Sequence, residues 1–388
     1  NIDLDKVTKK YDGLDGTELA VSESQERMAV VITKENAEKF IEFAKKENLE
    51  ATVVANVTDD ERLTMTWRGK TIVDLKRSFL DTNGAEQETR VKVTAPTEYP
   101  YEIKDIDVKK EWIDNLKKLN VCSKKGLIER FDSTIGCNTV LMPLGGKYQK
   151  TPAEGMAAKI PVQGNESLDA SIMTYGFNPY LGMWSPFHMA FYSVIESVTK
   201  LVAMGGDYKK ARLTFQEYFE KLSKDEKRWG KPFGALLGAY KAQMDLEIPA
   251  IGGKDSMSGS FGDIDVPPTL VSFAVGVEKA KNIISPEFKK ENSNVVLLKS
   301  TKLEDGTIEM NEFKNNLNKV HELILEGKII SAYSVKFGGV SEGLTKMALG
   351  NKIGVEFDNL SKEELFGFNY GSLILEINED VNIDKEFT

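Results

Sequence analysis

The sequence predicts an α/β protein, and two stretches of the chain carry that prediction. Residues 28–32 and 51–57 are apolar runs typical of buried strands, and residues 37–46 between them place apolar side chains at helical spacing. Residues 295–335 show the same alternation of strand-like and helix-like patterns. We therefore expect one α/β unit near the start of the chain and another near its end.

Length, composition and charge set limits on function. The chain has 388 residues, 41% of them hydrophobic and 29% charged, which suffices for two or three domains. Its net charge of −9 argues against a general nucleic-acid or anionic-membrane surface. No apolar run approaches the roughly 20 residues of a membrane span. Cys122 and Cys137 form no metal-type pair and indicate a reducing compartment, so we expect a cytoplasmic protein.

The first part of the chain reads as the end of an α/β domain, which we place at residues 1–80. Residues 63–67 and 71–75 flank Arg68-Gly69-Lys70, a sequence typical of a hairpin turn. Residues 81–125 are charged and contain two prolines, so we interpret them as a linker with a short helix.

A long helix is predicted at the centre of the next unit, residues 126–283. Ser185-Pro186 has the residue types of a helix start, and Gly205-Gly206 provides a stop. Residues 225–244 form a second helical pattern, which glycines and a proline weaken in its first half.

The final unit, residues 284–388, reads as α/β. Strands are expected at residues 295–299 and 329–335, with a helix at residues 310–325 between them. A paired-glycine turn then leads into a helix from Ser341.

The segment Gly252-Gly253-Lys254-Asp255-Ser256-Met257-Ser258 is the most informative motif. It follows an apolar run at residues 246–251 and precedes another at residues 270–275. Paired glycines can adopt positive φ and form a nest of N–H groups for an anion, while Lys254 and Ser256 add a charge and a hydroxyl. The segment could hold a phosphorylated small molecule. A glycine hairpin with a solvated lysine is an equally open interpretation.

A second polar motif, residues 22–28 (SESQERM), precedes the apolar run at residues 28–32. Glu23, Ser24 and Gln25 place a carboxylate, a hydroxyl and an amide side by side, a combination that could recognise a ribose or an amide. A polar turn leading into a strand is the competing interpretation.

Other candidate residues carry weaker signals. Glu196 and Lys200 are one helical turn apart, which is more typical of a surface ion pair than of a site, although Glu196 could instead face a cleft. Cys137 lacks the small residue two positions later that an exposed nucleophile elbow requires, so we do not expect it to be catalytic. No histidine–carboxylate cluster suggests zinc.

Taken together, SESQERM, YLGMWSPFH at residues 180–188, GGKDSMS and residues 267–275 resemble phosphoribosylformylglycinamidine synthase in its large single-chain form. The resemblance implies two tandem halves, each like aminoimidazole ribonucleotide synthetase, with a β-barrel-forming domain and an α/β domain, followed by a glutaminase. By this comparison residues 1–80 end the first half, residues 126–283 are the barrel-forming domain of the second half, and residues 284–388 are its incomplete α/β domain. Because residue 1 is Asn, we expect a piece of a longer protein.

The resemblance also implies a reaction and partners. Formylglycinamide ribonucleotide, glutamine and ATP would give formylglycinamidine ribonucleotide, ADP, phosphate and glutamate, with Mg²⁺ in the intact enzyme. Ammonia would displace the phosphate of an iminophosphate, so the protein's task is positioning and charge stabilisation. Glu23, Ser24, Gln25 and Ser256 are implied substrate-binding residues. The first-half domain and the glutaminase domain are the implied partners, and we expect the piece alone to be inactive.

The chain departs from the family pattern at its auxiliary nucleotide site. Gly253 and Lys254 would line this site, but Lys254 stands where smaller relatives have an asparagine metal ligand. A Glu-x-x-x-Asn pair is here Glu196 and Lys200, and an acidic turn has lost both aspartates and gained Lys336. We therefore expect the Mg–nucleotide site to be vestigial, with lysines that pair with Glu196 in place of the metal.

Two other readings remain. The chain could be a non-catalytic half that frames the active site and docks the glutaminase. A nucleotide-dependent kinase of the same superfamily, of the thiamine-phosphate or selenophosphate type, is weaker because the acidic Mg²⁺ clusters of those enzymes are missing here.

Overall fold

The computed structural model describes residues 1–9, 11–23, 27–82, 88–97, 107–131, 134, 136–378 and 381. The chain divides into two compact units, residues 1–88 and 89–388, and each is described by itself. Among the described residues, every helix is too short or too polar to cross a lipid bilayer.

Unit 1 is built on a small sheet with strand order β1-β2-β3. The predicted hairpin is confirmed: β2 and β3 pair antiparallel, and both turn residues have positive φ, 49° at Arg68 and 74° at Gly69. The predicted helix at residues 37–46 is also confirmed as α2. The elements are β1 (Ile2–Asp3), α1 (Gly16–Val21), α2 (Ala37–Lys46), β2 (Arg62–Trp67), β3 (Lys70–Lys76) and α3 (Arg77–Leu80), with short 3-10 helices at Leu4–Lys6 and Lys34–Asn36.

Two strands expected in unit 1 do not form. Residues 28–32 have no strand structure and are exposed, Val31 by 81%, and residues 51–57 contribute only an isolated bridge between Ala55 and Ile2. An apolar run becomes a buried strand only where a neighbouring strand and a covering layer exist. Within the described part of unit 1, β1-β2-β3 is the only sheet, and α2 buries none of its residues.

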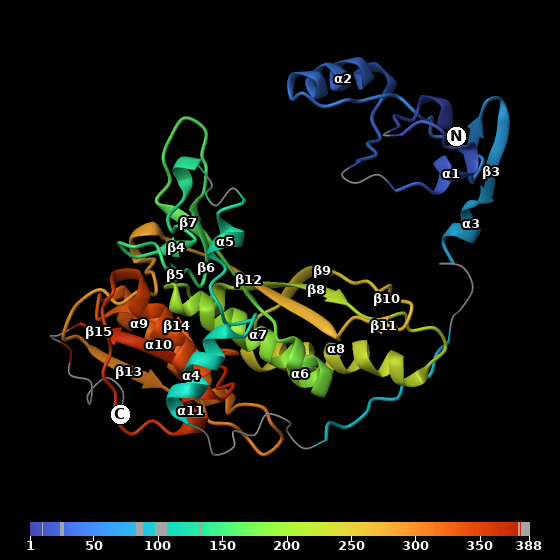
Figure 1. The fold of residues 1–388 in the computed structure, drawn as a ribbon. Coiled ribbons are helices and arrows are strands. Elements are labelled where there is room, and N and C mark those ends of the chain that lie inside the picture. Colours follow the sequence, from blue (N-terminus) through green and yellow to red (C-terminus); the bar gives the residue numbers. More distant parts are fainter. Residues whose placement is uncertain are drawn as a thin grey trace. The chain divides into compact units, whose positions relative to one another are not determined.

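Unit 2 is organised around a five-stranded sheet with strand order β6-β7-β12-β8-β9 (Figure 1). Neighbouring strands are antiparallel except β8 and β9, which run parallel. The predicted strand at residues 270–275 is confirmed within β12, the long central strand. The strands are β6 (Gly155–Lys159), β7 (Asp169–Gly176), β8 (Arg212–Tyr218), β9 (Ala250–Lys254) and β12 (Thr269–Lys279).

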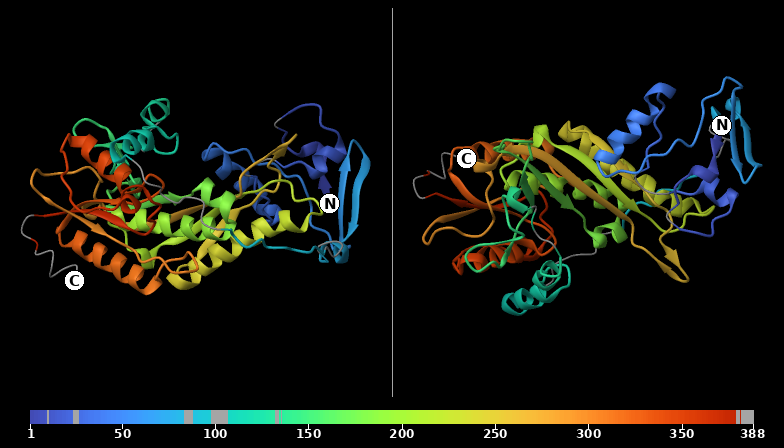
Figure 2. Two further views of the ribbon diagram at one scale, coloured as in Figure 1. Left: turned by 60° about the horizontal axis from the view of Figure 1, so that its bottom comes forward. Right: turned by 90° about the horizontal axis from the view of Figure 1, so that it is seen from above.

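A long helix, α7 (Pro186–Ala203), packs against this sheet, and a second, α8 (Glu226–Leu246), packs beside α7, as the left view of Figure 2 shows. Both predicted helices are therefore confirmed. The Ser185 hydroxyl accepts a hydrogen bond from the His188 N–H and caps α7. The glycines of α8 permit close packing, because a Cβ atom at Gly238 would collide with the Phe187 carbonyl of α7.

A second sheet, with strand order β13-β15-β14, forms the C-terminal part of unit 2. The predicted strands and the helix at residues 310–325 are confirmed. The elements are β13 (Asn294–Leu298), α9 (Met310–Leu325), β14 (Ile329–Ser334), α10 (Gly339–Asn351), α11 (Lys362–Phe366) and β15 (Leu373–Ile377). The buried faces of α7, α9 and both sheets contribute to one large hydrophobic core.

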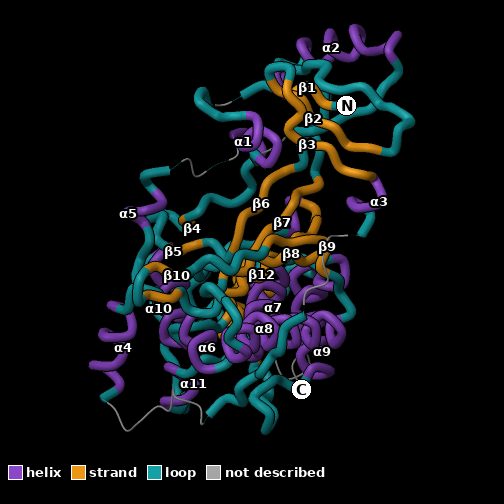
Figure 3. The backbone as a smooth tube through the Cα atoms, turned by 90° about the vertical axis from the view of Figure 1, so that its right-hand side faces the viewer, coloured by secondary structure: helices purple, strands orange, loops and turns teal. Residues whose placement is uncertain are grey.

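Short elements complete unit 2, and Figure 3 distinguishes them by type. The short helix expected in the linker at residues 81–125 is present as α4. The expected domain boundaries at residues 80, 125 and 283 stay predictions. The elements are α4 (Val108–Lys117), α5 (Lys125–Ile128), β4 (Leu144–Gly145), β5 (Thr151–Pro152), α6 (Pro179–Trp184), β10 (Ser260–Phe261) and β11 (Ile264–Asp265), with 3-10 helices at Gly136–Asn138, Tyr208–Lys210 and Ala280–Asn282.

Candidate functional site

The glycine-rich motif is a strand rather than a nest. Gly252, Gly253 and Lys254 belong to β9, and neither glycine has positive φ. The expected nest of N–H groups is therefore wrong. The apolar run at residues 246–251 spans the end of α8 at Leu246 and the start of β9 at Ala250. The glycine at 253 has a packing reason, because its Cβ would lie 2.5 Å from the Phe215 carbonyl oxygen of β8. Whether Gly253 and Lys254 bind a nucleotide stays a prediction.

Ser256 lies just beyond the end of β9, and its main chain is hydrogen-bonded to β8 and to the residue after it. Its N–H donates to the Glu217 carbonyl at 3.2 Å, and its carbonyl accepts from the Phe219 N–H at 2.9 Å. Its hydroxyl lies 2.9 Å from that of Ser258. The side chain is half-buried, so one hydroxyl pair is held in a fixed place beside the strand.

An open pocket of about 540 Å³ lies beside this motif. One wall is the helix α8, and the other is the strand pair β8 and β9. Aromatic and aliphatic side chains dominate the lining, together with two carboxylates. The lining residues are Thr89, Val91, Phe215, Glu217, Trp229, Pro232, Phe233, Leu236, Gly252, Gly253, Lys254, Asp255 and Met257.

Glu196 and Lys200 form an ion pair inside the core and not on the surface. The Lys200 Nζ lies 2.6 Å from the Glu196 Oε1, and the two side chains are 5% and 6% exposed. Lys200 also donates to the Tyr175 carbonyl at 2.8 Å, and the Phe177 N–H donates to Glu196 at 3.2 Å. Burial favours neutral Lys200, but Glu196, Tyr175 and Glu154 outweigh it and raise the lysine pKa.

Lys336 pairs with a different carboxylate from the one expected. Its Nζ lies 2.5 Å from the Glu154 Oε1, so the expected pairing of Lys336 with Glu196 is wrong. The Ser334 N–H and hydroxyl donate to the other Glu154 oxygen. Burial by itself would raise the pKa of Glu154, but Lys336 and Lys200 outweigh it and lower that pKa.

A third buried pair joins Glu342 and Lys346 on α10. Glu342 also accepts from the Gly338 N–H at 2.8 Å and from the Tyr333 hydroxyl at 3.3 Å. Burial raises the pKa of Tyr333 well above its ordinary value, with Glu342 and Glu154 adding to the effect. Together the three pairs form a charge-balanced cluster, which we call the lysine–glutamate cluster: Glu154, Glu196, Lys200, Lys336, Glu342 and Lys346.

Sequence reasoning missed half of this cluster. Glu342 and Lys346 have the i, i+4 spacing that suggests an ion pair on a helix, and this signal was available. Glu154 carries no local signal, because its partner lies 182 residues away on another element. Among the described residues, no three histidine, cysteine or acidic side chains gather as they would around a metal ion.

The first substrate-binding motif is only partly described. Glu23 is exposed and belongs to unit 1, whereas Ser24 and Gln25 lie outside the described residues. Cys137 is exposed, and the structure gives it no histidine partner among the described residues.

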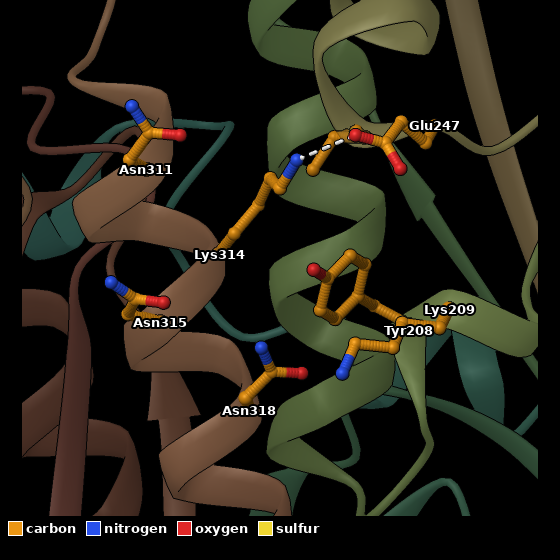
Figure 4. Close-up of a pocket in the computed structure, with 8 residues that line it drawn as sticks. Tyr208, Lys209, Glu247, Asn311, Lys314, Asn315 and Asn318 are labelled. Carbon is orange, nitrogen blue, oxygen red and sulfur yellow. Dashed lines mark hydrogen bonds and ion pairs between the residues drawn. The ribbon is translucent and has the colours of Figure 1, made fainter.

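A second pocket, of about 490 Å³, lies between α9 and the end of α8 (Figure 4). Its central cation already has a structural role, because Lys314 donates to the Asp245 carbonyl and to Glu247, both at 3.1 Å, at the C-terminus of α8. Asn318 is hydrogen-bonded to Tyr208. With these groups engaged, this pocket is a weaker candidate than the one beside β9.

Comparison with known proteins finds similarity to one family model and to several curated proteins. A family described as "AIR synthase related protein, C-terminal domain" matches residues 1–68. The phosphoribosylformylglycinamidine synthase subunit PurL of Thermoplasma volcanium is 24% identical, covering 100% of this chain and 53% of its own length. PurL of a Sulfurovum species is 27% identical, covering 91% of this chain and 49% of its own. The chain thus spans about half the length of these curated relatives.

Solved structures agree in fold. "T. maritima PurL complexed with ATP" has a TM-score of 0.68 at 18% identity and covers 98% of this chain and 57% of its own. "Structure of PurLQS from Thermotoga maritima" has a TM-score of 0.69 at the same identity and coverage. The expected resemblance and the synthetase-like α/β fold are confirmed. The relatives are PurL subunits, and membership in the single-chain form stays a prediction.

Proposed function

We propose that this chain is part of an ATP-dependent phosphoribosylformylglycinamidine synthase. The enzyme would convert formylglycinamide ribonucleotide, glutamine and ATP to formylglycinamidine ribonucleotide, ADP, phosphate and glutamate. The observation that carries this proposal is the similarity to PurL subunits over essentially the whole chain. Solved relatives described as complexes with ATP and with FGAR support the choice of ligands.

The proposal includes cofactors and partners of the intact enzyme. ATP and Mg²⁺ would serve the first-half active site, and a glutaminase would deliver ammonia. A relative solved as PurLQS, an assembly by its name, supports such a partner. We expect a cytoplasmic enzyme and an inactive isolated piece.

Within this enzyme, Glu23, Ser24, Gln25 and Ser256 would contact the substrate. The fixed hydroxyl of Ser256 beside β9 supports this role, because a positioned donor loses little entropy when it binds a ligand.

We assign the lysine–glutamate cluster to the place of the auxiliary Mg–nucleotide site. A lysine 4 Å from a divalent ion costs about 8 kcal/mol at an effective dielectric near 20, twice the value for two unit charges. The oxygens of Glu154 and Glu196 are already engaged by lysines and by main-chain N–H groups or hydroxyls. These residues do not suit Mg²⁺, and Lys200 and Lys336 take the place of its charge.

A structural role for this half is the alternative, and the same cluster favours it. Two of its ion pairs lie within α7 and within α10, and the third joins Glu154 to Lys336. Hydrogen bonds between these side chains and Tyr175, Phe177 and Tyr333 connect the cluster to β7 and β14. A half of this kind would frame the active site and dock the glutaminase. The positions of Gln25 and Ser256 in a shared cleft would distinguish the two roles, and Gln25 lies outside the described residues.

The proposal is tested in the intact synthase by ATP hydrolysis that depends on ammonia and formylglycinamide ribonucleotide. Gln25→Ala and Ser256→Ala should raise KM for the ribonucleotide or lower the rate, while Asp263→Asn on an exposed turn should change neither. Unchanged kinetics in both alanine variants, with the synthase activity present, would favour the structural role. Absence of any ribonucleotide-dependent hydrolysis in the intact protein would overturn the proposed reaction.

A further inference from the structure

Strand β8 carries a carboxylate where its pattern requires an apolar side chain. Leu213, Phe215 and Phe219 alternate along β8 and just beyond it as the inward-facing residues, and Glu217 occupies the same register. Its side chain therefore faces α8 and is half-buried. Burial, and after it the charge of Asp255, raises the pKa of Glu217. Among the described residues, this carboxylate has no hydrogen-bonding or ion-pair partner.

The register of β9 places a second carboxylate beside it. Phe215 pairs with Gly253 and Gln216 with Lys254, so Glu217 falls opposite Asp255, and the adjacent Ser256 N–H donates to the Glu217 carbonyl at 3.2 Å. Paired residues share a face of the sheet. The register pairs Lys254 with Gln216 and not with Glu217. Although Lys254 borders the pocket, the pKa of Glu217 is raised by burial and by Asp255, with no opposing effect of a lysine.

Both carboxylates line the pocket of about 540 Å³ whose other wall is aromatic. Phe215, Trp229 and Phe233 contribute ring faces or edges, and Leu236 and Met257 add aliphatic surface. Aromatic rings attract cations, and an unpaired half-buried carboxylate lacks a counter-charge. The pocket therefore combines two features that complement a flat positive group.

We propose that this pocket beside β9 is a binding site for a planar organic cation of the amidinium or guanidinium class. The cation would lie against the rings of α8 and donate N–H bonds to Glu217, with Asp255 at the rim. This inference is independent of the proposed synthase reaction, because it rests on the pocket alone.

Benzamidine is a suitable probe, because it joins a flat apolar ring to an amidinium. Calorimetric titration of the 388-residue chain at pH 8 should show saturable binding of one benzamidine. Glu217→Gln should weaken it by about tenfold to hundredfold, the usual loss for a charge-assisted hydrogen bond. Asp255→Asn should weaken it less, and Asp263→Asn, which removes the same charge from an exposed turn, should leave it unchanged.

Two further measurements test whether the charge of the ligand and the aromatic rings of the pocket are what drives binding. Neutral benzamide has nearly the same shape and should bind at least about tenfold more weakly if charge drives recognition. Phe233→Leu keeps an apolar side chain at this position but removes the aromatic ring, so it should reduce benzamidine affinity severalfold. Glu217→Gln removes an unpaired carboxylate and should leave the fold intact by circular dichroism. Equal binding of benzamidine to wild type and Glu217→Gln, equal binding of benzamide, or absence of benzamidine binding would each overturn the proposal.

Discussion

The Lys200 Nζ and the Glu196 Oε1 lie 2.6 Å apart, one turn of α7 from each other, and both side chains are at most 6% exposed. A buried pair of this kind differs from a surface pair in its response to mutation. Removing one partner leaves an uncompensated charge in a medium of low dielectric, whereas replacing both can be nearly neutral. The contrast between single and double variants is therefore informative.

Lys200→Met should lower the free energy of unfolding by about 3–5 kcal/mol, because Glu196 is left buried without its counter-charge. The double variant Lys200→Met, Glu196→Gln should recover most of the loss. Urea denaturation of the 388-residue chain at pH 7 measures both. Lys279→Met is the matched control: its pair with Asp169 is about half exposed, so its loss should stay below about 1 kcal/mol. Equal losses for Lys200→Met and Lys279→Met would contradict the buried pair.

The stabilisation from Glu154 should depend on pH in a definite direction. Its pKa is lowered in the folded chain, so its ionised form contributes stability above its unfolded pKa of about 4.3. That contribution disappears as the pH falls through the lower folded value. The difference in unfolding free energy between wild type and Glu154→Gln should therefore be constant from pH 7 to pH 5 and shrink below pH 4.3. A difference that grows on acidification would refute the assignment.

Several elements of unit 2, α7 and α9 among them, were predictable from sequence because their signals are local. Ser185-Pro186 starts α7 through a cap and a fixed φ, and the apolar period over residues 310–325 fixes α9. The strand predictions that failed were those in which strand formation depends on a neighbouring strand. Residues 28–32 are as apolar as a buried strand, yet no strand pairs with them in the described part of unit 1.

The candidate site was harder to predict, because it depends on contacts between distant segments. Gly252 and Gly253 suggest a turn by composition, but pairing with β8 holds them extended. Lys336 could be placed near a carboxylate by charge, but only the fold selects Glu154 over Glu196. Glu217 stands out only when the bounds of β8 are known, because it then occupies a position that otherwise holds inward-facing apolar residues. Residue type alone does not mark it.

Nucleotide binding to the lysine–glutamate cluster should be absent. Calorimetric titration of the 388-residue chain with ADP should give no binding that depends on magnesium, because Lys200 and Lys336 neutralise the carboxylates that a metal would require. A titration with MgCl₂ alone is the control for non-specific heat. Tight ADP binding that appears only with magnesium would show that the lysines leave room for the metal and would end the vestigial interpretation.

The two glycines of β9 should respond differently to the same substitution. A Cβ at Gly253 would lie 2.5 Å from the Phe215 carbonyl oxygen, so Gly253→Ala must push β9 away from β8 and should destabilise by about 1–3 kcal/mol. A Cβ at Gly252 meets no atom within 4 Å, and φ there is not positive. Gly252→Ala should therefore be neutral or stabilise by up to about 1 kcal/mol, through the loss of freedom in the unfolded chain.

Thermal unfolding of the two alanine variants checks this contrast directly, and each serves as the other's control. The nest that the sequence suggested would require positive φ at the glycines, in which case alanine would be unfavourable at both positions. A strand in register with β8 penalises only position 253. Equal destabilisation by Gly252→Ala and Gly253→Ala would therefore favour the nest over the strand. It would also contradict the geometry of the pocket beside β9, because Asp255 lies opposite Glu217 only if β9 pairs with β8 in this register.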